Sequence, residues 1–186
     1  MKVSDNRSKK VAVLATDGFE QSELLDPAGA LQEAGASVVV VTPEGEAIRG
    51  WKDQEWGQTI KADMSLGDAN PDDFDALLLP GGVINSDKLR TSIAAQDFAR
   101  HFFEVDKPVF AICHGAQILI DAELVDGRKI TSYHAISTDL INAGAEWEDA
   151  EVVEDGRLIS SRDPDDLPAF CSAICRALGL KVSQPA

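Results

Sequence analysis

A cysteine and a histidine stand side by side as Cys113 and His114 in the stretch AICHGAQ. Ala111 and Gly115 flank Cys113 at the two positions that small residues occupy in the nucleophile elbow G-x-S-x-G. A thiol on such a strand-to-helix turn faces unpaired N–H groups and the positive end of the helix dipole, which favour the thiolate. We therefore expect Cys113 to be an acidic nucleophile. The alternative is a small buried hydrophobic residue that ends a strand.

Two further residues are candidates for proton transfer at this thiol. His114 is a candidate base, but neighbours at a sharp turn project in different directions, so an imidazole facing solvent or a subunit contact is an equal alternative. Glu20 opens a helix in the stretch TDGFEQSE. If the first and fourth strands are neighbours, we expect its carboxyl to reach Cys113, keep its proton and donate a hydrogen bond to sulfur. Otherwise Glu20 only complements the helix dipole.

The stretch LPGG ends another strand with Gly81 and Gly82. Two glycines permit a turn whose N–H groups point into a cleft, and the N–H of Gly82 would form an oxyanion hole with that of His114. An ordinary tight turn is the alternative. Cys171 and Cys175 are four residues apart on an amphipathic pattern and are expected to fill the core.

These residues need elements that bring them together, and the apolar pattern predicts those elements. Short, mostly continuous apolar runs are typical of strands buried on both faces; they cover residues 9–16, 36–42, 74–80 and 107–112. Helical patterns cover residues 21–35, 91–105 and 163–179. The β-α-β alternation predicts a parallel sheet, in which ligands bind beyond the carboxyl ends of the strands. Hairpins are expected within residues 43–64 and, around Asp-Gly, within 151–162.

Composition limits the classes of function. The chain has 186 residues and 44% hydrophobic residues, which suits one domain at 9–179 with flexible termini at 1–8 and 180–186. Its formal charge of −15 opposes tight binding to nucleic acids or anionic membranes. We find no secretory signal and no apolar run near the roughly 20 residues that span a bilayer. Three cysteines fit a reduced compartment, so a cytoplasmic protein is expected.

Four stretches together resemble the ThiJ/PfpI family of the class I glutamine amidotransferase-like superfamily. They are VAVLATDGFEQSELLDP, FDALLLPGG, KPVFAICHGAQILI and TSYHAISTDLINAGAEWEDAEVVEDGRLISSR, and the resemblance runs from about Lys9 to Leu178. It is closest to the PfpI peptidase-like, general-stress-protein branch. The resemblance implies an α/β flavodoxin-like three-layer sandwich, a mainly parallel sheet between helices with a β-hairpin excursion, assembled as dimers or hexamers.

The resemblance also implies roles for individual residues. The nucleophile falls on Cys113, its protonated partner on Glu20 and the oxyanion-hole glycine on Gly82. His114 would join an acid from a neighbouring subunit, for which Asp87 is the candidate. Tyr133 falls on a position that lines the family's pocket, and His134 follows it where proline is frequent.

The favoured function is a glyoxalase or deglycase that acts on 2-oxoaldehydes or their early protein adducts through Cys113, without a metal or redox cofactor. One alternative is an oligomeric intracellular cysteine peptidase that uses Cys113, His114 and Asp87 of another subunit. Another is a non-enzymatic oxidative-stress sensor or holdase, in which Cys113 is oxidised to sulfinic acid. Trp51 and Trp56, on the expected hairpin, are candidate interface anchors.

Overall fold

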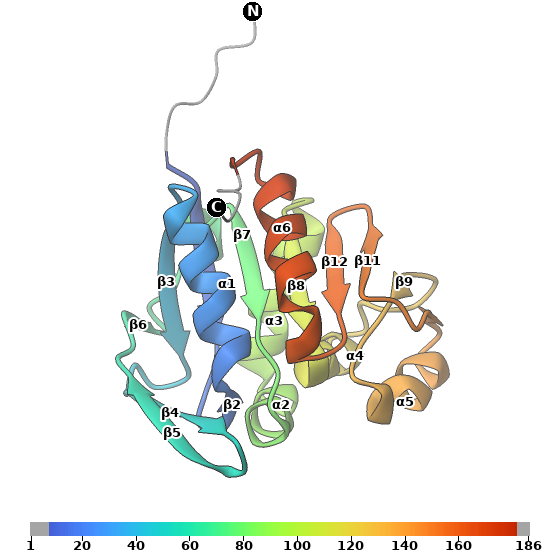
Figure 1. Ribbon diagram of the computed structural model, residues 1–186, viewed down its shortest axis with the longest axis horizontal. Coiled ribbons are helices and arrows are strands. Elements are labelled where there is room, and N and C mark those ends of the chain that lie inside the picture. The colour runs from blue at the N-terminus through green and yellow to red at the C-terminus, as the bar shows by residue number, and fades with distance from the viewer. Residues whose placement is uncertain (1–7, 182–186) are drawn as a thin grey trace, which may run out of the picture.

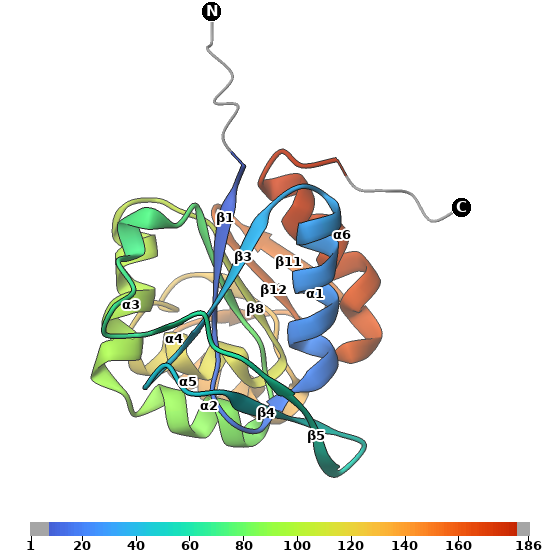
Figure 2. The same cartoon turned by 90° about the vertical axis from the view of Figure 1, so that its left-hand side faces the viewer.

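A central sheet lies between two layers of helices in the computed structural model, which describes residues 8–181 (Figures 1 and 2). Its strand order is β11-β12-β8-β7-β1-β3-β6, and every neighbouring pair is parallel except β11 with β12. The strands are β1 (Lys10–Leu14), β3 (Ser37–Thr42), β6 (Met64–Ser65), β7 (Ala76–Leu79), β8 (Val109–Ile112), β11 (Val152–Asp155) and β12 (Leu158–Ser161). The predicted parallel α/β sandwich is confirmed.

Helices cover both faces of the sheet, as Figure 2 shows. On one face lie α1 (Gln21–Glu33) and α6 (Leu167–Ala177); on the other lie α2 (Val83–Arg90), α3 (Ile93–Glu104) and α4 (Gln117–Asp121), with α5 (Ser137–Asn142) beside α4. All residues of β7 and β8 are buried because helices cover both faces, which explains their continuous apolar runs. Short 3₁₀ turns are η1 (Pro71–Asp73), η2 (Cys113–Ala116), η3 (His134–Ile136) and η4 (Pro164–Asp166).

Two small sheets extend from this frame. A hairpin of β4 (Ile48–Lys52) and β5 (Glu55–Ile60) pairs through β4 with β2 (Phe19–Glu20), next to the first turn of α1. The other small sheet is β9 (Lys129–Ile130) with β10 (Glu146–Trp147). The hairpin predicted within 43–64 is therefore present, and its parallel pairing with β2 brings it to the carboxyl end of β1.

The predicted helices begin and end close to their expected limits. Ser92 is the N-cap of α3 and its hydroxyl accepts a hydrogen bond from Ala95 N. Gly35 follows α1 with a φ of 95°, a conformation that favours glycine after a helix. Residues 83–90 form α2, a short helix that is not among the predicted helical patterns. The predicted flexible termini lie outside the described residues except for Ser8, Leu180 and Lys181. Within residues 8–181, no helix has the length and apolar character to cross a membrane.

Candidate active site

The turn after β8 holds Cys113 in a strained conformation. Its φ is 61°, in the left-handed region that residues other than glycine seldom adopt. Gly115 lies against the end of β7, because a Cβ there would meet the carbonyl oxygens of Leu79 and Pro80. The small residue two places after Cys113 is therefore required by a close approach of two backbones, as the elbow spacing predicts.

Glu23 is the carboxyl group at this thiol. Its side chain is completely buried beside the thiol of Cys113, and its Oε2 accepts a hydrogen bond of 2.9 Å from Gly81 N. Burial raises the pKa of Glu23 to about 8, the charge of Glu20 adds to that rise, and the hydrogen bond with Cys113 opposes it. Glu23 is therefore mainly protonated at neutral pH. Its Oε1 has no hydrogen-bond partner among the described residues.

This geometry corrects the expectation that Glu20 is the partner of the thiol. The condition for that contact was that the first and fourth predicted strands are neighbours, but β7 lies between β1 and β8. Glu20 is the N-cap residue of α1, and Glu23 lies nearly one turn further along the helix. A signal was available: the buried stripe of α1, which includes Leu31, Pro27 and Leu24, extends backwards to Glu23.

The expected acidity of Cys113 also needs correction. The residue is 7% exposed, and burial, followed by the charge of Glu23, raises the pKa of its thiol well above the ordinary value. Hydrogen bonds from the backbone N–H groups of His114 and Gly82 act in the opposite direction. The repulsion from Glu23 disappears when that carboxyl is protonated, and its O–H can then be donated to sulfur. Thiolate formation at Cys113 therefore depends on the proton held by Glu23.

The imidazole of His114 lies close to the thiol of Cys113, although neighbouring residues at a sharp turn often project in different directions. Its Nδ1 is 3.3 Å from Cys113 Sγ, and its ring stacks on that of Tyr133 with centroids 5.0 Å apart. The ring of Tyr133 in turn lies 4.4 Å from that of His134. Burial, and secondarily the charge of His134, lower the pKa of His114, which favours the neutral imidazole needed by a base.

A cavity of about 430 Å³ opens in front of these groups. Of the predicted site residues it brings together Cys113, His114, Glu20, Gly82 and Tyr133. Its full lining is Gly18, Glu20, Glu23, Trp51, Gly82, Val83, Ile84, Cys113, His114, Tyr133 and Pro164. In the described part of the chain, no three histidine, cysteine, aspartate or glutamate side chains gather as a metal site.

Other predicted residues lie at the edge of the site or away from it. Gly81 binds Glu23 through its N–H, and exposed His134 packs against the Tyr133 ring without lining the cavity. Asp87 is exposed on α2, and residues 8–181 show no hydrogen bond between it and His114. Its role as an acid for another subunit stays a prediction. Cys175, on α6, is buried in the core as expected, whereas Cys171 on the same helix is only partly buried.

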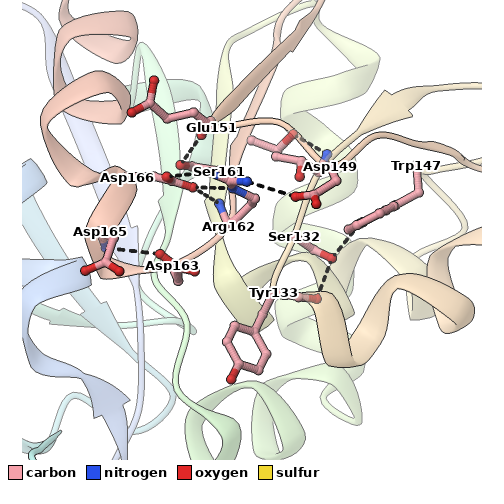
Figure 3. A network of polar contacts seen from close by, with 12 residues as sticks. Ser132, Tyr133, Trp147, Asp149, Glu151, Ser161, Arg162, Asp163, Asp165 and Asp166 are labelled. Atoms are coloured by element: carbon pink, nitrogen blue, oxygen red, sulfur yellow. Dashed lines mark hydrogen bonds and ion pairs between the residues drawn. The ribbon is translucent and has the colours of Figure 1, made fainter.

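A polar network adjoins Tyr133, one of the residues that line the cavity (Figure 3). The backbone N–H of Tyr133 donates to the carbonyl of Cys113, and the hydroxyl of Ser132 joins the carbonyl of Tyr133 to the indole N–H of Trp147. Figure 3 shows the Tyr133 ring pointing away from this network. Beside it, Arg162 binds Asp166 through two nitrogens, at 2.8 and 2.9 Å, and Asp149 at 2.8 Å.

Comparison with known proteins finds one family model and several relatives that match nearly the whole chain. The model of the DJ-1/PfpI family matches residues 9–177. The chain is 49% identical over 164 residues to "Putative cysteine protease YraA" of Bacillus subtilis, covering 88% of this chain and 94% of that protein. It is 46% identical over 174 residues to "Protein/nucleic acid deglycase 2" of Escherichia coli, covering 92% and 99%.

A solved structure from Anabaena variabilis, a two-domain protein with DJ-1/ThiJ/PfpI-like and ferritin-like domains, superimposes with a TM-score of 0.90 at 37% identity. The match covers 96% of this chain and 50% of that one, so the chain spans half the length of this two-domain protein.

Proposed function

Because this chain belongs to the DJ-1/PfpI family, we propose that it is a cysteine-dependent stress-protection enzyme for 2-oxoaldehydes or their early protein adducts. The activity would be that of a glyoxalase or deglycase. One observation carries the proposal: the thiol of Cys113 contacts both a largely protonated carboxyl, Glu23, and an imidazole, His114, within one cavity. A relative with 46% identity bears the name of a deglycase, which supports the same chemistry.

The chemistry begins with the thiol of Cys113 adding to the aldehyde carbon of methylglyoxal. The carbon–sulfur bond forms, the thiol proton passes through His114 to the aldehyde oxygen, and a hemithioacetal results. The N–H groups of Gly82 and His114 stabilise the oxygen while it carries negative charge.

A proton then moves from the former aldehyde carbon to the adjacent carbonyl carbon. Glu23 exchanges this proton, since a carboxyl whose pKa is about 8 exists in both forms near neutral pH. The resulting thioester is hydrolysed by water to lactate and the free thiol. With a hemiaminal adduct of a protein amine as substrate, the sulfur of Cys113 displaces the amine: the carbon–sulfur bond forms, the carbon–nitrogen bond breaks, and the amine leaves with the thiol proton. This step gives the same hemithioacetal and releases the repaired amine.

The test is lactate formed from methylglyoxal by the wild type, minus that formed by Cys113→Ser. Lactate is the right product to measure because any thiol or amine traps the aldehyde reversibly. We expect lactate to depend on Cys113 and to fall strongly in Glu23→Gln. Equal lactate from wild type and Cys113→Ser would refute the proposal.

A cysteine peptidase is the second candidate, favoured by the 3.3 Å approach of Cys113 Sγ to His114 Nδ1. We propose that this activity would require a homo-oligomer in the cytoplasm, with Asp87 of one subunit next to His114 of another. Peptide hydrolysis lost in both His114→Ala and Asp87→Asn, together with an oligomeric mass by light scattering, would support it. A monomer would exclude an acid supplied by another subunit.

A further inference from the structure

Asn85 is a buried polar residue in the first turn of α2. It is 1% exposed, although asparagine favours neither helices nor buried positions. Its Nδ2 donates to the carbonyls of Pro80 and Gly81, both at 3.1 Å, and its Oδ1 accepts from Thr16 N at 2.8 Å. These partners fix the orientation of the amide, because a carbonyl only accepts and a backbone N–H only donates. The amide therefore joins the turn after β7 to the loop after β1.

The two carbonyls that Asn85 holds belong to peptides whose N–H groups face the site. The C=O of Pro80 shares a peptide plane with the N–H of Gly81, which donates to Glu23 Oε2 at 2.9 Å. The C=O of Gly81 shares the next plane with the N–H of Gly82. Both peptides are trans, so the C=O and the N–H of each point in opposite directions. Holding each carbonyl therefore aims the N–H on the other side of its plane.

The N–H of Gly82 faces the thiol in this arrangement. The carbonyl on the same plane, that of Gly81, is held from two sides, since Glu20 N also donates to it at 3.2 Å. Gly82 and Cys113 line the same cavity, and the Gly82 N–H favours the charged form of the thiol. Glycine has access to many backbone conformations, so a Gly-Gly turn needs such bonds to keep its N–H groups in one direction.

We propose that Asn85 is a positioning residue of the site: its single amide group aims the N–H of Gly81 at the carboxyl and the N–H of Gly82 at the thiol. Through these N–H groups it stabilises the anionic forms of Glu23 and Cys113, which burial disfavours. The Gly82 N–H then meets the developing oxyanion without reorganisation. This last step rests on the proposed function, whereas the direction of the N–H groups does not.

NMR relaxation of the backbone nitrogens measures how firmly each N–H is held. In the wild type, the N–H groups of Gly81 and Gly82 should have order parameters of about 0.85, the value of rigid backbone. Asn85→Ala should lower both towards about 0.6, the range of flexible backbone. The N–H of His114 is the internal reference and should keep its value, because the bonds of Asn85 end on the turn after β7 and the loop after β1.

Alkylation of Cys113 by iodoacetamide measures the chemical consequence, with peptide mass spectrometry as the readout. In Asn85→Ala the rate at neutral pH should fall about tenfold, the effect of losing one hydrogen bond to a charged group. The profile of rate against pH should move to higher pH, since the thiolate loses a donor. A loss of access alone would lower the rate equally at every pH. Cys171 and Cys175 in the same digest report general changes in alkylation.

Ser86→Ala is the matched control. Ser86 follows Asn85 on α2 and is also 1% exposed, but its hydroxyl has no hydrogen-bond partner among the described residues. This variant should leave the order parameters and the alkylation profile unchanged. An equal effect of the two substitutions would assign the result to packing of α2 and would overturn the role of the Asn85 amide.

Two further results would contradict the proposal. One is an Asn85→Ala variant whose Gly82 order parameter and Cys113 profile both match the wild type. The other needs no variant: a Gly82 N–H that is already mobile in the wild type. Neither relaxation nor alkylation needs turnover, so a protein that forms no lactate can still show the role of Asn85, and the two proposals fail separately.

Discussion

Cys113 and Glu23 are two acids that compete for protons in a buried site. Burial disfavours the charged form of both groups, and a negative charge on one disfavours ionisation of the other. The pKa of each group is therefore raised. A single proton on Glu23 removes the charge next to sulfur and provides a hydrogen-bond donor to the thiolate. The reactivity of the thiol is therefore set by the pair.

The raised pKa of Glu23 predicts a dependence of stability on pH. A carboxyl with a pKa of about 8 in the folded state, against an ordinary value of 4.5, stabilises the fold fully below pH 4.5, and this contribution is lost as the pH rises through 8. Relative to Glu23→Gln, the free energy of unfolding should fall between these pH values by up to a few kcal/mol, at about 1.4 kcal/mol per pKa unit.

Urea denaturation at several pH values measures this difference. Both proteins should carry Cys113→Ser, so that only one member of the pair titrates. Parallel curves of unfolding free energy against pH would show that Glu23 keeps an ordinary pKa.

At the scale of elements, the site depends on how closely the turn after β8 approaches the end of β7. A Cβ on Gly115 would meet the carbonyl oxygen of Leu79, a backbone atom that cannot move aside alone. Gly29, in the interior of α1, has open space around its Cα. The backbone of β7 therefore excludes a side chain at position 115, whereas position 29 has room for one.

Gly115→Ala should lower the free energy of unfolding by about 1–3 kcal/mol, the cost of overpacking, and slow the alkylation of Cys113 as the turn shifts. Gly29→Ala, its matched control, should raise the free energy of unfolding by up to about 1 kcal/mol, because alanine favours a helix. Chemical denaturation measures both. A Gly115→Ala variant with unchanged stability and unchanged alkylation of Cys113 would contradict the close approach of the two backbones.

At the scale of the whole molecule, Arg162 ties the C-terminal helix to the segment that follows β10. Asp166, at the start of α6, is 3% exposed and accepts two hydrogen bonds from the Arg162 guanidinium, which also binds Asp149 (Figure 3). Removing the guanidinium would leave a buried carboxylate without its charged partner.

Arg162→Met should therefore lower the free energy of unfolding more than Arg176→Met does, because the buried carboxylate of Asp166 loses its charged partner. Arg176→Met breaks an exposed ion pair with Glu154 and should cost less than about 1 kcal/mol. Thermal or urea unfolding compares the two variants. Equal losses would show that the Arg162 network is only a surface feature.

Much of the fold and the position of the nucleophile follow from the sequence by itself. Continuous apolar runs, Asp-Gly at 155–156 and Ser92 before a helical pattern are signals that act over a few residues, and they determine the strands, the hairpin and the helix start. The small residues around Cys113 predict its turn in the same local way.

Only the tertiary structure decided which carboxyl meets the thiol. The pairing of β2 with β4 places Glu20 opposite Trp51, and the first turn of α1, which follows, brings Glu23 to Cys113. The raised pKa of the thiol is likewise a consequence of burial by distant segments, which outweighs the local backbone hydrogen bonds. Contacts between residues far apart in the chain set both results, so local patterns cannot supply them.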